Sequence, residues 1–258
     1  MIETMREIYR YREMLKSTVF KNIRQRYKGS VLGFFWTFLN PLLQLVIYSI
    51  VFSTIMRINL ENYSMFLFVG LLPWIFFSAT ILTSTGTIVN NSNLIKKIYF
   101  PREILPLAIG LSELINFLLS LLILIPAMIF FKINVTIAIV VLPVIVIIQL
   151  IMVLGFAFIF SALNVYFRDL EHILGVFMMA WFYLTPILFP VEMIPEGFLR
   201  LFKLNPVAPL MIAYQDIFYY GTFPQWESLF NTFIISVILL VIGMGIFGNL
   251  KYKFAEEI

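Results

Sequence analysis

Six long apolar runs, separated by short polar segments, constrain this chain more than any other feature of its 258 residues. A helix needs about 20 mainly apolar residues to cross the hydrocarbon core of a bilayer, and each run meets or approaches that length. Because the runs do not alternate apolar and polar residues, they predict helices rather than the strands of a barrel. The predicted fold class is all-α integral membrane with six transmembrane helices. The spans are Val31–Met56, Met65–Thr87, Ile104–Phe131, Val135–Leu163, Ile173–Phe189 and Leu229–Leu250.

Charged side chains are too scarce to cover a water-facing surface over most of the chain. They make up 12% of the residues, against 61% hydrophobic residues, and the mean hydropathy is +0.97. A soluble domain usually carries about a quarter charged residues, so lipid is the natural solvent here. The net charge of +4 comes from the connecting segments and is no argument for binding nucleic acid. The sequence has no cysteine, which excludes a disulfide framework.

The positive charges indicate which side of the membrane holds the chain ends. An even number of spans places both termini on one side. All but four of the 18 Lys and Arg residues fall on that side, and the exceptions are Arg57, Lys132, Arg200 and Lys203. The positive-inside rule then places both termini in the cytoplasm and the protein in the cytoplasmic (inner) membrane.

A single transmembrane domain is expected over 1–258, because the connecting segments are too short for a soluble domain. Val207–Tyr220 is apolar but too short to span, and it contains Gln215 and Asp216, so a re-entrant or interfacial element is expected. The predicted parts are a cytoplasmic interface helix (1–30), spans one to five (31–189), a re-entrant outer-side segment (190–228), span six (229–250) and a cytoplasmic tail (251–258).

The N-terminal segment predicts an amphipathic helix that lies on the membrane. Apolar side chains recur every three or four residues over 3–28, at Ile8, Tyr11, Leu15, Val19, Ile23 and Tyr27. The candidate interface cations are Arg10, Arg24, Arg26 and Lys28. We expect the apolar stripe to face lipid and the cations to face anionic headgroups. A membrane anchor and a docking element for a cytoplasmic partner are both open as roles.

Polar and helix-breaking residues inside the predicted spans mark candidate path or gate positions. Asn40-Pro41 interrupts the first span, where proline removes a backbone donor and kinks the helix. Glu113 lies within the third span, where a carboxylate is costly and seldom faces lipid. Its expected role is either structural pairing or lining a path. Gln44 and Gln149 are expected to bridge helices.

Aromatic residues make up 17% of the chain, and several clusters suit a carbohydrate path. Sugar rings present apolar C–H faces that stack on aromatic rings. The aromatic candidates for the path or gate are Phe35, Trp36, Trp74, Trp181 and Tyr183. For any single one of them, packing or a place in an interfacial belt is the commoner role.

The sequence carries none of the usual energy-converting or catalytic motifs. It has no GxxxxGK[ST] phosphate-binding run, and its one histidine, His172, suits a surface role. We expect no catalytic, cofactor or metal site in this chain. We also expect another subunit to supply the energy for its function. Two short cytoplasmic loops, Asn90–Glu103 and Asn164–His172, are placed to receive that energy. Their candidate coupling residues are Asn93, Lys96, Lys97, Tyr99, Arg102, Glu103, Tyr166, Arg168, Asp169 and Glu171.

Together with the first span, these two loops carry a resemblance to a known family. The matching segments run in order along nearly the whole chain, and they are specific as a set. They are 26–33 (RYKGSVLG) with Trp36 and Asn40-Pro41, 70–74 (GLLPW), 112–116 (SELIN), 164–169 (NVYFRD), 185–187 (TPI) and Asn205-Pro206. The chain resembles the permease subunit of ABC-2-type polysaccharide exporters of the O-antigen and teichoic-acid class.

The resemblance implies six spans, an N-terminal interface helix and short re-entrant helices over Pro190–Pro224. It implies that the two loops couple the permease to a separate nucleotide-binding subunit, which would bind ATP and Mg. Two permease copies would pair, bind two copies of that ATPase subunit and export a lipid-linked glycan between them. An ABC-2 exporter of a drug or lipid is the main alternative. An ATP-independent transporter and a membrane glycan transferase are weaker ones, since the sequence lacks their expected charge patterns.

Overall fold

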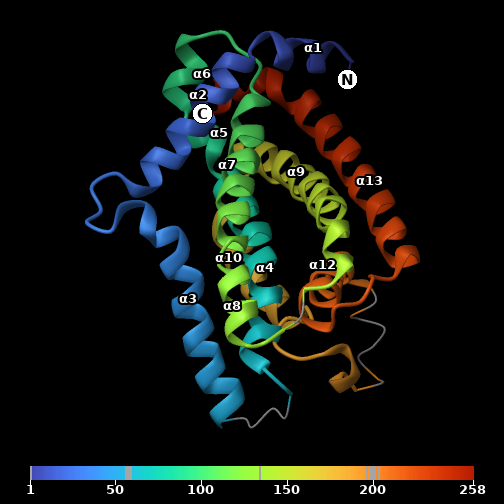
Figure 1. Ribbon diagram of the computed structural model, residues 1–258. Helices are drawn as coiled ribbons and strands as arrows, with labels where there is room; N and C mark the ends of the chain where they lie inside the picture. Colours follow the sequence, from blue (N-terminus) through green and yellow to red (C-terminus); the bar gives the residue numbers. More distant parts are fainter. Residues whose placement is uncertain (1, 56–59, 134, 196, 198–201, 203) are drawn as a thin grey trace.

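The computed structural model describes residues 2–55, 60–133, 135–195, 197, 202 and 204–258, and every regular element in those ranges is a helix (Figure 1). Within them, the stretches long and apolar enough to cross a membrane are Gly33–Phe52, Tyr63–Thr85, Ile104–Phe130, Ile137–Tyr166 and Trp226–Glu257. They coincide with the first four predicted spans and the sixth, which confirms the all-α integral membrane fold class. The predicted span end Met56 and the cations Arg57, Arg200 and Lys203 lie outside the described residues.

The elements used below are, in chain order, α1 (Ile2–Arg10), α2 (Arg12–Tyr27), η1 (Gly33–Phe35), α3 (Trp36–Ser49), η2 (Ile50–Ile55), α4 (Tyr63–Thr85), α5 (Thr87–Asn90), α6 (Ser92–Lys97), α7 (Ile104–Leu121), α8 (Leu124–Phe130), η3 (Ile137–Val141), α9 (Leu142–Tyr166), α10 (Leu170–Tyr183), η4 (Val191–Met193), α12 (Ala208–Gln215), η6 (Asp216–Tyr220), α13 (Trp226–Leu250), η7 (Lys251–Lys253) and α14 (Phe254–Glu257).

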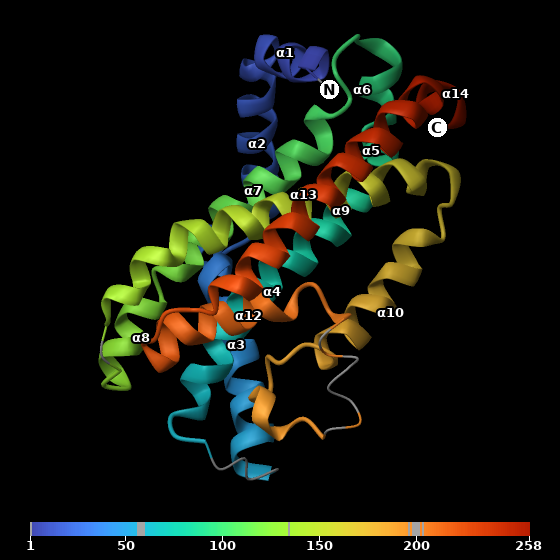
Figure 2. The same cartoon turned by 90° about the vertical axis from the view of Figure 1, so that its right-hand side faces the viewer.

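Both chain ends lie at one end of the bundle, called the terminal end below (Figure 1). Helices α1, α5, α6 and α14 gather there, while α8 and α12 lie toward the opposite, far end (Figure 2). The loops that contain α6 and that join α9 to α10 are both at the terminal end. This arrangement agrees with the predicted placement of both termini on one side.

The fifth predicted span, Ile173–Phe189, is shorter in the structure than an ordinary transmembrane helix. Its helix is α10, whose 14 residues rise about 21 Å. The chain then turns at Leu184 and Thr185, whose amides bond the carbonyls of Ala180 and Phe182. Pro186 explains the stop, because a residue before proline is disfavoured in the helical region and proline has no N–H to donate. The fifth crossing is therefore a short apolar helix followed by a turn.

Helix α4 is the centre of the core. It packs against α3, α7, α9, α10 and α12, and its Phe66, Leu67 and Phe77 are completely buried. Gln149 of α9 donates through Nε2 to the Pro73 carbonyl of α4 at 2.8 Å and accepts at Oε1 from the Tyr214 hydroxyl of α12 at 2.7 Å. Gln149 therefore bridges three helices, which confirms its predicted role.

The interface helix differs from its prediction in two respects. It is broken at Tyr11, whose φ of −96° and ψ of 21° depart from helical values, so α1 turns away from α2 (Figure 2). In α2 the apolar stripe faces the protein rather than lipid: α2 lies along α7, and Val19 is buried. Packing against α7 removes these apolar side chains from water, so they do not need contact with lipid. Of the predicted cations, Arg10, Arg24 and Lys28 remain exposed, and the side chain of Tyr27 lies outside the described residues.

Two glycines lie where the backbones of helices α9 and α13 are in close contact. A Cβ added to Gly155 would lie 2.8 Å from the backbone nitrogen of Leu240, and one added to Gly243 would collide with the Gly155 carbonyl oxygen. Small residues of this kind let helix backbones pack closely in membranes. The pair therefore sets the distance between the fourth and sixth spans.

Asn205 holds the far end of α10 through its side-chain amide. Its Oδ1 accepts from the indole Nε1 of Trp181 at 2.9 Å and from the Val207 amide at 3.0 Å. Its Nδ2 donates to the Leu184 carbonyl at 3.0 Å and the Thr185 hydroxyl at 2.9 Å. The two matching segments around 185–187 and 205–206 are thus one hydrogen-bonded unit.

Replacing Asn205 with leucine is expected to lower stability by about 2–4 kcal/mol, since several buried groups lose their partner and each such group costs about 1–3 kcal/mol. Thermal unfolding of the purified protein in detergent measures the loss. Asn231→Leu, at an exposed position of α13, is the control and should change little. Equal unfolding temperatures for the two variants would rule out the Asn205 network as a stabilising unit.

Candidate functional site

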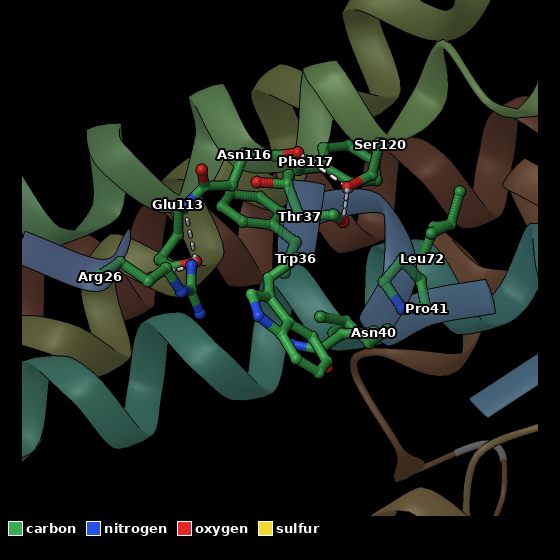
Figure 3. Close-up of a pocket in the computed structure, with 12 residues that line it drawn as sticks. Arg26, Trp36, Thr37, Asn40, Pro41, Leu72, Glu113, Asn116, Phe117 and Ser120 are labelled. Carbon is green, nitrogen blue, oxygen red and sulfur yellow. Dashed lines mark hydrogen bonds and ion pairs between the residues drawn. The ribbon is translucent and has the colours of Figure 1, made fainter. Parts of the chain in front are cut away.

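An ion pair between the interface helix and the third span is the most unusual polar contact among the described residues. Arg26, at the end of α2, donates from Nη1 to both carboxylate oxygens of Glu113 in α7, at 2.9 and 2.7 Å (Figure 3). Asn116 Nδ2 donates to the same carboxylate at 3.4 Å. The Glu113 side chain is 10% exposed and that of Arg26 is 42% exposed. Glu113 is thus paired, which is one of its two predicted roles.

A cavity of about 190 Å³ lies beside this ion pair, and Glu113 is one of the residues that line it. Lining a path was the other role predicted for Glu113. Figure 3 shows Arg26 and Glu113 at one side of the cavity and Pro41 at the other. Helices α3, α4 and α7 supply most of its wall. The lining residues are Arg26, Trp36, Thr37, Asn40, Pro41, Leu72, Ile75, Phe76, Glu113, Asn116, Phe117 and Ser120.

A second cavity, of about 310 Å³, shares Arg26, Glu113 and Asn116 with the first. Its other walls come from α2, through Lys21 among others, and from α4 and α5. The ion pair therefore lines both cavities.

The structure brings only part of the predicted path together. Trp36, Asn40, Pro41 and Glu113 all line the first cavity, and Trp36 Nε1 donates to the Ser30 hydroxyl at 3.1 Å. Phe35, immediately before Trp36, is 64% exposed.

The other aromatic candidates lie elsewhere. Trp74 is buried in the core of the chain against Phe77 and Phe182. Trp181 donates to Asn205 toward the far end, and Tyr183 is exposed near the end of α10. None of these three lines the cavities described above.

The two predicted coupling loops present mostly exposed side chains at the terminal end. In the first loop these are Asn93, Lys96, Lys97 and Tyr99, and in the second they are Arg168, Asp169 and Glu171. Three predicted residues point inward instead. Glu103 is buried and paired with Lys251, Arg102 lies 5.9 Å from the ring centre of Phe254, and the Tyr166 hydroxyl donates to the Leu250 carbonyl at 3.2 Å.

The C-terminal segment is the part that sequence reasoning missed. Phe254 of α14 is completely buried in a cluster with Ile95 and Phe100 of the first loop and Val165 of the second. The signal in the sequence is a phenylalanine that follows two lysines in the charged tail, 251–258 (KYKFAEEI). The tail joins both loops to the last span.

Membrane-length helices joined by short loops at one end are typical of the membrane subunit of a transporter. The chain matches the family of ABC-2 type transporters over residues 13–219 and belongs to that family. The resemblance inferred from its segments is confirmed.

Three relatives illustrate the family's range. The chain is 40% identical to the O-antigen export system permease protein RfbA of Myxococcus xanthus, with 100% of both chains covered. It is 37% identical to a protein of the same name from Klebsiella pneumoniae, over 92% of this chain and 91% of that one. It is 26% identical to the polysialic acid transport protein KpsM of Escherichia coli, over 88% of this chain and 89% of that one.

Proposed function

We propose that this chain is the permease subunit of an ATP-driven exporter that moves a lipid-linked polysaccharide out across the cytoplasmic membrane. The observation that carries the proposal is its similarity, over the whole of both chains, to an O-antigen export system permease. The more distant relative named for polysialic acid transport also handles a polymer of sugars. The glycan here would be an O-antigen, a teichoic acid or a similar lipid-linked polymer.

A homodimer bound to two copies of an ATPase subunit is the proposed assembly. The family supports a separate ATPase, and the sequence lacks a phosphate-binding run of its own. ATP and Mg would bind that partner. The first loop has two exposed cations and an exposed aromatic residue, Lys96, Lys97 and Tyr99. Both this loop and the second loop lie at the terminal end (Figure 2). By the positive-inside rule this end is cytoplasmic, where ATP is available.

Co-purification with the ATPase subunit, followed by ATP turnover with and without lipid-linked glycan, tests this function. We expect a stable complex whose turnover rises when the glycan is added. A drug or an unglycosylated lipid of the same carrier type should produce no rise. Stimulation by those compounds and not by glycan would assign the chain to the alternative class of ABC-2 exporters.

A variant of the first loop tests whether this loop binds the ATPase subunit. Tyr99→Ala with Lys96→Ala is expected to weaken binding of the ATPase by about tenfold or more, because aromatic and cationic contacts at the centre of an interface often cost over 1–2 kcal/mol when removed. Met193→Ala is the matched control, since Met193 is exposed in η4, outside the terminal end. If both variants bind the ATPase subunit equally well, the first loop is not part of the interface with that subunit.

A further inference from the structure

A second ion pair, at the base of the first coupling loop, is buried more deeply than the Arg26–Glu113 pair. Lys251 Nζ lies 2.7 Å from Glu103 Oε1, with the two side chains 19% and 4% exposed. Glu103 immediately precedes α7, where the helix N-terminus favours a negative charge. The other carboxylate oxygen, Oε2, is buried and has no hydrogen-bond partner in the part of the chain that the structure describes.

Glu103 therefore depends on Lys251 for its position. Removing one partner of a buried ion pair leaves an uncompensated charge, which costs far more than the intact pair contributes. Without Lys251 the carboxylate would move toward water. The end of the first loop and the start of α7 would move with it, because Glu103 joins them.

Apolar packing attaches the rest of the loop base to the same tail. The Phe254 ring lies 5.3 Å from that of Phe247 and 6.5 Å from that of Tyr166, centre to centre. The Arg102 guanidinium lies within cation–π range of Phe254, at 5.9 Å. The tail thus contacts the base of the first loop, the end of α9 and the end of α13.

The exposed tip of the loop stands on this fixed base. Lys97, Ile98 and Tyr99 are exposed, and Pro101 restricts the backbone between them and Glu103. Beyond Glu103, α7 continues to Glu113, about 15 Å further along the same helix. A force on the tip would pass through the base into α7 and reach the Arg26–Glu113 pair, whereas a loose base would absorb it.

We propose that Lys251 is a positioning residue for energy coupling. The segment 251–258 serves as a clamp that makes the first coupling loop move as one body with α7. This role rests on the proposed function, in that the force is supplied by an ATPase subunit. It assigns a task to the C-terminal segment, which contributes none of the predicted coupling residues.

The first test uses the permease alone, so it does not depend on the proposed function. Because the chain contains no cysteine, Tyr99→Cys provides a single site for a spin label. Lys251→Met in this background is expected to increase the mobility of the label, seen as narrowed spectral lines. Lys253→Met, which removes the same charge from an exposed position two residues away, should leave the spectrum unchanged. An unchanged spectrum for Lys251→Met would overturn the clamp.

The second test uses the complex with the ATPase subunit and unlabelled permease variants. Lys251→Met is expected to lower the ratio of glycan-stimulated to basal ATP turnover by about tenfold, within the usual range of coupling between sites. Lys251→Arg, which keeps the charge, should restore most of the ratio, and Lys253→Met should match the wild type. A wild-type ratio for Lys251→Met would refute the role of Lys251. Absence of glycan stimulation in the wild type would instead count against the proposed function.

If Lys251→Met prevents folding, the double variant Glu103→Gln with Lys251→Met provides the same tests, because it leaves no buried charge unpaired. It is expected to fold and still to show the mobile label and the reduced ratio. Wild-type values in both measurements would show that the ion pair does not position the loop.

Discussion

Gly243→Ala is expected to destabilise the protein by about 1–3 kcal/mol, the usual cost of forcing an extra methyl group into a filled core. The added Cβ would collide with the carbonyl oxygen of Gly155, which is backbone and cannot turn aside like a flexible side chain. Helices α9 and α13 would have to separate along their contact. Thermal unfolding in detergent and the yield of folded protein in the membrane both measure the effect.

Gly245→Ala provides a matched control on the same helix. Among the described residues, no atom beyond its chain neighbours and the nearby backbone of its own helix lies within 4 Å of a Cβ placed at Gly245. Alanine is favoured over glycine inside a helix by up to about 1 kcal/mol, so this variant should be neutral or slightly more stable. If Gly243→Ala unfolds at the same temperature as Gly245→Ala, the close approach of α9 and α13 does not limit stability.

Arg26→Met is expected to cost about 1–3 kcal/mol and to impair export. Among the described residues, the substitution leaves the nearly buried Glu113 carboxylate with the long side-chain hydrogen bond from Asn116 Nδ2. Breaking a fully buried pair would cost about 3–5 kcal/mol, and the smaller figure applies because the Arg26 side chain is 42% exposed. Arg24→Met removes the same charge from an exposed position of α2 and should change little.

A double-mutant cycle separates the ion pair from other effects of the substitution. Glu113→Gln should cost less than Arg26→Met, because a neutral amide replaces the carboxylate and leaves no buried charge. The double variant should lose less stability than the sum of the two single losses, by about 0.5–3 kcal/mol. Additive losses would show that Arg26 and Glu113 do not interact in the folded protein.

Much of the fold follows from patterns that are local in the sequence. Apolar runs of about 20 residues predict spans because the bilayer has a fixed thickness. The third span shows the strength of this rule, since the predicted Ile104–Phe131 and the observed Ile104–Phe130 differ by one residue. The fifth shows its limit, because the length of an apolar run does not reveal that Thr185-Pro186 ends the helix early.

The candidate site was only partly predictable, because its members come from distant segments. Glu113 was recognisable from its cost in lipid, but its partner Arg26 is 87 positions away and looked like a headgroup-facing cation. Trp74 and Trp181 matched an aromatic path by type, yet one is buried in the core and the other donates to Asn205. Residue type predicts that an aromatic ring will pack, but not which neighbour it packs against.

From its amino-acid order alone this chain is a membrane-embedded helical protein with its loop charge concentrated on one side, because hydropathy, span length and charge bias act residue by residue. Folding in three dimensions added the contacts between segments far apart in the chain. It paired Arg26 with Glu113 beside two cavities, turned the apolar stripe of α2 onto α7 and placed Phe254 and Lys251 beneath the first loop. Such pairings depend on which helix faces which, and no local pattern encodes that.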